Sequence, residues 1–520
     1  MYSEVISGMT LGIGGMFVRV ETDISPGLPM LSMVGYLASS VKEAGERVRT
    51  AVKNSGFILP ASRITVNLSP ADIRKDGAIF DLPIAVAILA SMQLIHQEKL
   101  KDTLILGELG LSGDVKAVDG VLPVVHYAQK NGIRRVILPL DNTDEAGFVD
   151  DIEIIGVKWL GDLVGFLEKG EKDNIRYIKT SPYRRKEIFD EREGAAGIEE
   201  DMSDICGQES MKRGVMIAAA GFHNILMSGA AGSGKSMIAG RIPGIMPGLT
   251  YEECLELTKI YSISGLLRDK DGLIRKRPFR SPHHTATEIA LIGGGVVPRP
   301  GEVSLADCGI LFLDELPEYK KKVIECLRQP MEDRKILISR HHAAYEFPAD
   351  FMLVAAMNPC PCGHYPDRRL CRCTDREINA YRNKISYPIM DRIDIRLEVK
   401  PVEYKDISKT SKGMTSAEMR DKVESARERQ LYRYREDGFL FNSRLPQNRL
   451  EEFIKLTGEG ERLLRNEFEK KKISARGYFR IKKLARTIAD INDREDIQAE
   501  DVFEAMFFRN ISDKGEENDG

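Results

Sequence analysis

The sequence lacks the long apolar runs of membrane proteins and the dense cysteines of small secreted domains. Its longest apolar run, Ile84 to Ala90, is far shorter than the roughly 20 residues that span a bilayer. The start of the chain, Met1 to Glu4, has no basic residue of the kind that opens a signal peptide. Eight cysteines in 520 residues do not form a disulfide scaffold. We therefore expect a cytoplasmic protein with no membrane partner.

The sequence also lacks an excess of charge of either sign. Lysine and arginine number 76, aspartate and glutamate number 79, and the formal net charge is −3. This balance excludes a uniformly basic surface for nucleic acid, although it is compatible with a local basic patch. At roughly 150 residues per domain, a chain of 520 residues predicts three or four domains.

The hydrophobic pattern predicts an α/β multidomain protein. Residues 1–170 alternate short apolar runs with turns, which predicts an α+β domain. The strands expected there cover residues 64–68, 103–107 and 136–139, and the helices cover residues 82–94 and 121–130. Residues 201–400 alternate strands and helices, a pattern typical of a parallel sheet.

The remaining segments are predicted from their charge. Residues 171–200 are charged and poor in apolar residues, notably at Tyr183–Lys186 and Asp190–Glu193, and we interpret them as an exposed linker. Residues 401–512 predict a helical lid. Residues 513–520 predict a disordered acidic tail.

A glycine-rich loop lies between an apolar strand and a helix in the second domain. It fits the pattern G-x-x-x-x-G-K-[ST] of a phosphate-binding loop, and it consists of Gly229, Ala230, Ala231, Gly232, Ser233, Gly234, Lys235 and Ser236. Glycines let backbone N–H groups approach phosphate oxygens, and the following helix adds positive potential. This loop predicts ATP binding, with Lys235 on the β- and γ-phosphates and Ser236 on Mg²⁺.

Two further apolar strands end in polar residues. Gly309 to Leu313 leads into Asp314 and Glu315, the pattern of a Walker B element. We expect Asp314 to hold Mg²⁺ through its water shell and Glu315 to deprotonate the attacking water. The strand Met352–Met357 ends at Asn358, which would reach the same water or the γ-phosphate from a neighbouring strand. A helix cap and a simple turn are the alternative interpretations of these polar residues.

With these elements the chain resembles the magnesium-chelatase-like branch of the AAA+ ATPases, and within it the YifB/ComM family. The resemblance covers nearly the whole chain. Its longest matching stretches are Asp204–Glu209, Arg280–Thr285, Leu291–Gly295, Pro298–Glu302 and Ser474–Arg476. It implies an ATPase core followed by a helical lid, with Gly207 to Glu209 near the adenine.

The resemblance also gives two arginines a role. Arg392 matches the arginine finger, which stabilises transition-state charge in a neighbouring subunit, and Arg476 matches the lid arginine called sensor 2. A finger implies that the chain assembles with itself into a ring, usually a hexamer. The alternatives are an ordinary ion pair of Arg392 with Asp391 or Asp394, and Arg480 in the place of Arg476.

Two insertions that line the pore of the ring are a further implication. One covers Glu288–Glu302, with a glycine-rich tip, and the other is a hairpin over Asp333–Phe347 with Arg340, His341 and His342 near its turn. Basic residues on such loops could follow the phosphate backbone of DNA, and packing between subunits is the alternative.

The helical lid carries a second group of basic residues: Lys471, Lys472, Arg476, Arg480, Lys482, Lys483 and Arg486. Basic helical faces of this kind are usually solvated. Contact with DNA is the alternative interpretation.

Half of the cysteines gather in one short segment and predict a metal site: Cys360, Cys362, Cys371 and Cys373. Four thiolates suit a structural Zn²⁺, although C-x-C pairs replace the usual C-x-x-C here. Reduced thiols without metal and a redox pair are the alternatives. Because the segment directly follows Asn358, a bound metal would stiffen the loop that carries this residue. The pair His283–His284, by contrast, is expected to pack or to form hydrogen bonds.

The first domain resembles the Lon-type protease fold without its catalytic pair. Lys75-Asp76-Gly77 matches the segment before the nucleophilic serine of that family, but Ala78 to Asp81 contain no serine. Gly113 to Pro123 also lacks the catalytic lysine. The spacing of the nearby Ser69 and Lys75 does not match. A Ser–Lys dyad needs both groups, so we expect a non-proteolytic domain that supports the ring or extends a DNA channel.

These features together predict a ring-forming ATPase that moves DNA. The family resemblance implies helicase or branch-migration activity in recombination, including natural transformation. A protein-remodelling ATPase of the magnesium-chelatase type is the alternative. A chelatase subunit would be a shorter ATPase without the first domain and the cysteine segment. A regulatory or scaffolding protein is disfavoured, because the residues for ATP hydrolysis are all present.

Overall fold

The computed structural model describes residues 1–181, 200–267, 272–340, 343–400, 413–438, 441–471 and 473–509. Several expectations concern residues outside these ranges: Tyr183–Lys186, Asp190–Glu193, His341, His342, Lys472 and the tail 513–520. Of the helices within these ranges, none is long and apolar enough to cross a membrane.

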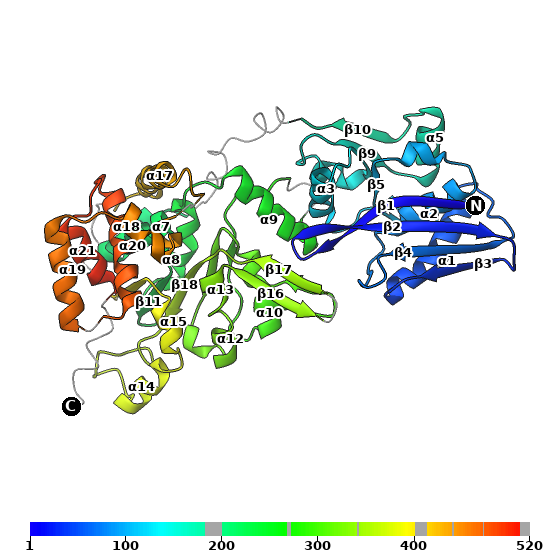
Figure 1. Cartoon of the computed structure of the whole chain (residues 1–520). Helices are drawn as coiled ribbons and strands as arrows, with labels where there is room; N and C mark the ends of the chain where they lie inside the picture. Colours follow the sequence, from blue (N-terminus) through cyan, green and yellow to red (C-terminus); the bar gives the residue numbers. More distant parts are fainter. Residues whose placement is uncertain are drawn as a thin grey trace.

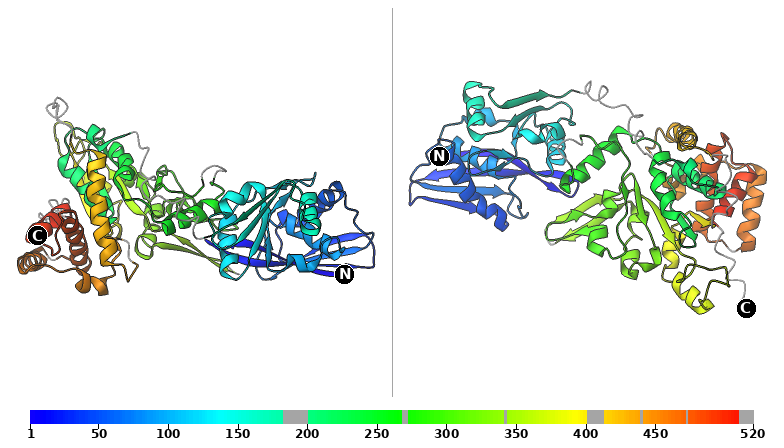
Figure 2. Two further views of the ribbon diagram at one scale, coloured as in Figure 1. Left: turned by 90° about the horizontal axis from the view of Figure 1, so that it is seen from above. Right: turned by 180° about the vertical axis from the view of Figure 1, so that it is seen from behind.

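Three parts lie in a row along the molecule, as Figure 1 and Figure 2 show. A domain built on a mixed sheet is at one end, a core built on a parallel sheet lies in the middle, and a helical region is at the other end. The α/β multidomain fold expected from the sequence is therefore confirmed.

The N-terminal domain is an eight-stranded sheet with the strand order β10-β9-β8-β5-β1-β2-β4-β3. Its strands are β1 (Tyr2–Leu11), β2 (Gly14–Ser25), β3 (Met30–Val34), β4 (Arg63–Ser69), β5 (Thr103–Ile105), β8 (Arg135–Pro139), β9 (Glu153–Val157) and β10 (Ile175–Lys179). The short strands β6 (Glu108–Leu109) and β7 (Val115–Lys116) form a separate ribbon. The helices are α1 (Ser39–Asn54), α2 (Asp81–Ser91), α3 (Val121–Lys130), α4 (Thr143–Ala146) and α5 (Leu160–Lys169).

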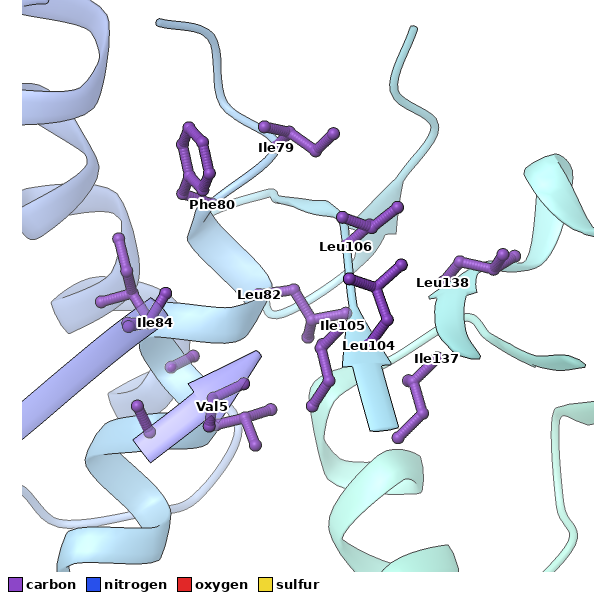
Figure 3. Close-up of a cluster of buried hydrophobic side chains, with 14 of the residues drawn as sticks. Val5, Ile79, Phe80, Leu82, Ile84, Leu104, Ile105, Leu106, Ile137 and Leu138 are labelled. Atoms are coloured by element: carbon purple, nitrogen blue, oxygen red, sulfur yellow. The ribbon is translucent and has the colours of Figure 1, made fainter. Parts of the chain in front are cut away.

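Helix α2 is the centre of this domain and is buried along its whole length. A helix that is apolar on all sides can be stable only inside a core. Figure 3 shows side chains from β1, α2, β5 and β8 meeting there. Ile79 and Phe80, which precede α2, belong to the same apolar cluster. The segment that would carry a serine in the Lon-type fold thus contributes apolar side chains to the core.

Strand β10 corrects the expected domain boundary at residue 170. It pairs antiparallel with β9, and Thr180 exchanges hydrogen bonds of 3.0 Å with the backbone of Ile152. As an edge strand, β10 keeps most of its charged side chains exposed, which is why its sequence resembles a linker. The expected helix 82–94 is also shorter, because Gln93 adopts a left-handed φ of 61° after α2 ends.

The central core is a parallel five-stranded sheet with the order β12-β15-β18-β11-β19. Its strands are β11 (Ile225–Gly229), β12 (Phe279–Arg280), β15 (Ile310–Leu313), β18 (Met352–Met357) and β19 (Ile395–Val399). Its helices are α7 (Glu209–Gly221), α8 (Lys235–Arg241), α9 (Tyr251–Ile263), α12 (Lys321–Glu325), α13 (Pro330–Asp333), α14 (Asp375–Arg382) and α15 (Tyr387–Asp391). The inner strands β15 and β18 are entirely apolar and buried because both faces of a parallel sheet are covered.

Two hairpins project from this core. The first consists of α10 (Glu288–Ile292), β13 (Gly293–Gly294), β14 (Arg299–Pro300) and α11 (Glu302–Leu305). The second consists of β16 (Lys335–Arg340) and β17 (Ala343–Pro348). Both match the insertions expected from the sequence.

The C-terminal region consists of helices α17 (Ser416–Arg433), α18 (Leu450–Phe453), α19 (Gly458–Lys471), α20 (Ala475–Ile491) and α21 (Ala499–Arg509). Two of its basic residues correct the expectation of a basic outer face. Lys482 is 4% exposed and binds Glu451, and Arg486 is 1% exposed and binds Asp490. Neither is solvated or available to DNA, because α20 turns them inward, where carboxylates neutralise their charge.

The N-terminal domain touches the core at two places. Helix α9 packs on α3, where Lys259 Nζ lies 2.9 Å from His126 Nδ1. The turn between β1 and β2 reaches β17, and the Ile13 N–H donates to the Glu346 carbonyl over 3.2 Å. At Gly12, a Cβ would lie 2.6 Å from that same carbonyl, so this close approach needs glycine.

Candidate functional site

The phosphate-binding loop lies between β11 and α8 at the centre of the parallel sheet. Strand β11 has β18 on one side and β19 on the other, so the strand order reverses there, where ligands of open α/β sheets bind. Gly234 begins α8 with a φ of 90°, which favours glycine. At Gly229 a Cβ would lie 2.4 Å from the Val399 carbonyl. The sequence of the loop therefore reflects both its curvature and its close packing on β19.

The ammonium group of Lys235 is buried within this loop. It donates to the carbonyls of Gly229 and Ala230 over 2.8 and 2.9 Å and to Asn358 Oδ1 over 3.3 Å. Burial lowers the pKa of Lys235, although nearby Asp314 and Glu315 oppose the shift. An anionic ligand would favour the charged form of the lysine, and the site is therefore suited to phosphate.

The acidic pair after β15 faces the start of α8. Ser236 Oγ donates to Asp314 Oδ2 over 2.7 Å, and the Glu315 N–H donates to Asp314 Oδ1 over 2.9 Å. Glu315 adopts a left-handed φ of 51° and its side chain is exposed. A hydroxyl beside a carboxylate is the oxygen donor set that Mg²⁺ takes in nucleotide sites, so these residues fit the ion. Glu315 is free to contact a water molecule.

Asn358 completes this group from the strand between the other two. It follows β18 directly, and β18 lies between β15 and β11. Parallel strands carry their carboxyl ends to the same edge, so residues far apart in the sequence meet there. The structure thus brings together the start of α8 and the polar residues that follow β15 and β18: Lys235, Ser236, Asp314, Glu315 and Asn358.

Arg392 and Arg476 meet at a different place, on the carboxylate of Glu332. Arg392 is 4% exposed and donates to the Pro388 carbonyl over 2.7 Å and to one oxygen of Glu332. Arg476 is half-exposed and donates to the other oxygen over 3.0 Å. Sequence reasoning missed Glu332, because it lies 60 residues from Arg392 and 144 from Arg476 with no local motif.

The aspartates beside Arg392 bind other arginines. Asp391 accepts from Arg509 over 3.3 Å, and Asp394 binds Arg480. Arg392 is thus ion-paired, as the alternative to the arginine finger has it, but its partner is Glu332 and not Asp391 or Asp394. Burial alone would raise the pKa of Asp394, but Arg480 and His223 hold it well below its usual range. Arg480 thus binds the core beside Arg392 while Arg476 reaches Glu332.

The two projecting hairpins contact each other. Arg280 forms a two-pronged ion pair of 2.7 and 2.8 Å with Glu302 at the base of the first hairpin. Arg340, at the end of β16, donates to the Gly295 carbonyl at the tip of the first hairpin over 2.9 Å. The two insertions therefore present one continuous surface.

The histidine pair next to these hairpins packs and forms hydrogen bonds. The rings of His283 and His284 lie 4.1 Å apart, and His283 Nδ1 lies 2.9 Å from Thr285 Oγ1. Within the described residues, neither histidine belongs to a group of potential metal ligands.

The four cysteines after Asn358 come together in space. The sulfur atoms of Cys360, Cys362 and Cys371 lie 3.4 to 3.7 Å apart, and the Cys373 sulfur lies within 4.8 Å of them. A tetrahedral site with Zn–S bonds of about 2.3 Å places its sulfurs about 3.8 Å apart. The backbone N–H of His364 lowers the pKa of the Cys362 thiol to about 6. All four cysteines are free rather than disulfide-bonded.

In the described part of the region that matches the protease site, no serine is hydrogen-bonded to Lys75, and Ser40 Oγ donates to Asp76 Oδ1 over 2.6 Å instead. Lys75 is fully buried, its Nζ has no hydrogen-bond partner within the described residues, and burial lowers its pKa. Asp81, at the start of α2, forms a two-pronged ion pair of 2.8 and 3.0 Å with Arg47. These charged groups support the core of the domain.

Comparison with known proteins gives matches along the chain. Residues 201–407 match the family described as magnesium chelatase, subunit ChlI, residues 20–142 match subunit ChlI of Mg-chelatase, and residues 413–509 match the ChlI C-terminal family. YifB of Escherichia coli is 40% identical over 510 residues, 98% of this chain and 97% of its own length.

Two further relatives match this chain, one over nearly its whole length and the other over one part of it. The competence protein ComM of Haemophilus influenzae is 40% identical over 508 residues, 97% of both chains. The archaeal Lon protease of Methanocaldococcus jannaschii is 30% identical over 175 residues, 31% of this chain and 27% of its own length. Similarity to ComM and YifB thus extends over all three parts, whereas similarity to Lon covers about a third.

Proposed function

The chain belongs to the YifB/ComM family of magnesium-chelatase-like AAA+ ATPases, and we propose that it is a ring-forming motor of the cytoplasm that hydrolyses ATP to move DNA. One observation carries the proposal: the polar residues that follow two parallel strands, β15 and β18, meet beside the phosphate-binding loop. The name of the competence protein ComM supports a role in transformation. The activity we propose within it is helicase or branch migration on single-stranded or branched DNA.

In this proposal each residue of the site has one task. Lys235 exchanges the loop carbonyls for the β- and γ-phosphates of ATP. Ser236 and Asp314 would hold Mg²⁺, and the ion would neutralise charge on the phosphate oxygens. Glu315 takes a proton from the attacking water, and Asn358 orients that water from the neighbouring strand.

Ring assembly adds the arginines. As a finger, Arg392 acts on a neighbouring subunit's ATP, and for this it must leave Glu332 and become exposed. Arg476 is the candidate for sensor 2, and it is already half-exposed. The proposed assembly is a hexamer.

The surface proposed for DNA is the one formed by the two projecting hairpins. Arg340 is exposed there, whereas Lys482 and Arg486 on the lid are buried. A phosphate backbone that passes through a ring of such hairpins would meet basic residues from each subunit. We also propose that Cys360, Cys362, Cys371 and Cys373 hold a structural Zn²⁺.

The test is ATP hydrolysis with and without single-stranded and forked DNA. We expect DNA to stimulate hydrolysis, and Glu315→Gln to lower the rate about 10²- to 10⁴-fold while ATP still binds. Glu318→Gln is the matched control, because Glu318 is exposed next to the site and binds Lys384 instead. If DNA neither stimulates hydrolysis nor binds at low salt, a motor on DNA is excluded.

The match to magnesium chelatase favours a second candidate, a protein-remodelling ATPase of the chelatase type. This candidate predicts the same sensitivity to Glu315→Gln. It differs in that hydrolysis responds to a partner protein and not to DNA. The DNA arm of the same assay therefore separates the two.

A further inference from the structure

The loop that holds the four cysteines forms one wall of the nucleotide site. It runs from Pro359, next to Asn358, to Thr374, where α14 begins. A Cβ at Gly363 would lie 3.6 Å from the Ala231 N and Cβ atoms, so the turn between the cysteine pairs lies close to the phosphate-binding loop. The cysteine segment thus lies beside Ala231 and directly follows Asn358, the residue after β18.

The loop has little apolar core of its own. Its buried cluster contains Cys360, Cys371 and Ile378, with Tyr365 and Cys373 packed against it at the edge. Apolar burial on this scale is small against the conformational entropy of a loop this long. A metal ion that joins residues distant in the loop is one of the few devices that fixes such a segment.

The backbone around the sulfurs is arranged as around a metal–thiolate centre. The Tyr365 N–H donates to Cys360 Sγ over 3.4 Å. Donors aimed at sulfur stabilise thiolates, the form of cysteine that binds metal. Four thiolates in a tetrahedron are the preferred donor set of Zn²⁺.

Helix α14 connects the cysteine cluster to Asn358. Ile378 packs against the cysteines, and one turn later the Tyr381 hydroxyl hydrogen-bonds to the backbone of Asn358. Arg382 donates to the Pro359 carbonyl over 3.3 Å and lies over the ring of Tyr365. Asn358 is therefore held in place by α14, the same helix that packs against the cysteine cluster.

We infer that Zn²⁺ bound by Cys360, Cys362, Cys371 and Cys373 positions the ATPase site, by fixing Asn358 through α14 and by supporting the phosphate-binding loop at Ala231. This inference rests on the proposed ATPase function and adds a positioning role for the metal. The cysteines touch no reacting atom. Their effect reaches the reaction through the placement of Asn358.

The first measurement is the metal content of the full-length chain purified without chelators or added metal. We expect about one zinc per chain, lost in Cys371→Ser and kept in Cys326→Ser. Cys326 is the matched control, because it lies outside the cluster and its thiol only donates to the Val323 carbonyl. Replacement of zinc by Co²⁺ should give the absorption of a tetrahedral tetrathiolate. A chain without metal, a disulfide between these cysteines, or a red iron-containing protein would overturn the assignment.

The second measurement tests positioning. Zinc is removed from the folded chain with a thiol reagent and returned after reduction, and folding is followed by circular dichroism. We expect kcat to fall about 10-fold or more and to recover with zinc, because a displaced Asn358 no longer orients the water. Affinity for a fluorescent ATP analogue, measured in parallel, should weaken less than kcat.

The variant Tyr381→Phe tests the positioning role without a general loss of folding. It removes one hydroxyl and leaves the cysteines untouched, so zinc and nucleotide affinity should remain while kcat falls severalfold. Full hydrolysis by a folded, zinc-free chain would overturn the positioning role. If the wild-type chain hydrolysed no ATP under any condition, the proposed function would fail. The zinc content and the change in nucleotide affinity on zinc removal would still test whether the metal shapes the site.

Discussion

Replacement of Glu332 by glutamine should loosen the segment around Arg392 much more than the segment around Arg476. Arg392 is 4% exposed, and its Nε is buried without a partner within the described residues. Loss of the charged partner of a buried ion costs about 3–5 kcal/mol. Because Glu332 itself is 48% exposed, water can reach part of the guanidinium, and we reduce this cost to about 2–3 kcal/mol.

The ion pair that the Glu332 carboxylate forms with Arg476 is expected to contribute little to stability. The side chains of Arg476 and Glu332 are 53% and 48% exposed, and ion pairs of this kind contribute about 0–1 kcal/mol. Arg476→Gln is therefore the matched control for Glu332→Gln. The two variants remove opposite partners of one exposed pair, but only Glu332→Gln disturbs the buried arginine.

Hydrogen exchange measured on peptides covering residues 386–394 is the suitable assay. A multidomain chain has no single free energy of unfolding, whereas exchange reports local opening. At about 1.4 kcal/mol per tenfold, the expected cost corresponds to about 30- to 150-fold faster exchange in Glu332→Gln. Arg476→Gln should change exchange by less than about fivefold. Equal and small changes in both variants would refute the reasoning, because Arg392 would then be held by something other than this carboxylate.

Two further predictions concern the contacts between the N-terminal domain and the core, and a third concerns DNA binding. Gly12→Val should accelerate amide exchange at Ile13, because the new side chain would collide with the Glu346 carbonyl. Burial lowers the pKa of His126 from 6.5 to about 4 and that of Lys259 to about 8. The folded state therefore binds fewer protons, so the α3–α9 contact should weaken as the pH falls from about 6.5 toward 4, as proteolysis would show. Arg340→Ala should lower the slope of log affinity for DNA against log salt by about 1.

Each of these has a simple control. Gly14→Val should leave exchange unchanged, because a Cβ there meets only one atom, at 3.6 Å. His126→Gln should remove the acid sensitivity, and its persistence would assign the effect to another group. Arg435→Ala, which removes an exposed arginine of the lid, should leave the salt slope as it is. An equal decrease in slope for Arg340→Ala and Arg435→Ala would mean that the hairpins are not the preferred surface for DNA.

The sequence predicted the phosphate-binding loop and the strands that end beside it because their signals are local. A glycine-rich loop before a helix, and apolar strands that end in Asp314 and Asn358, are visible over a few residues each. The expectation that they meet followed from one rule, that parallel strands end at a common edge. The helix α3 was predicted to the residue for the same reason, since its apolar spacing is continuous.

The errors arose where exposure or partners had to be known. A charged edge strand and a linker have similar composition, so β10 was taken for part of the linker. Lys482 and Arg486 look like part of a basic face, although both side chains are buried and paired with carboxylates. Exposure depends on what packs against a helix, and neighbours along the sequence do not contain that information.

The sequence alone determined the family, the phosphate-binding loop and the polar ends of the strands, because each is written in consecutive residues. Only the tertiary structure decided which distant residues share a partner. It joined Arg392 and Arg476 on Glu332, placed the cysteine loop against Ala231, and set the turn of β1 and β2 against β17. These pairings depend on how layers pack in three dimensions, and no spacing along the chain specifies them.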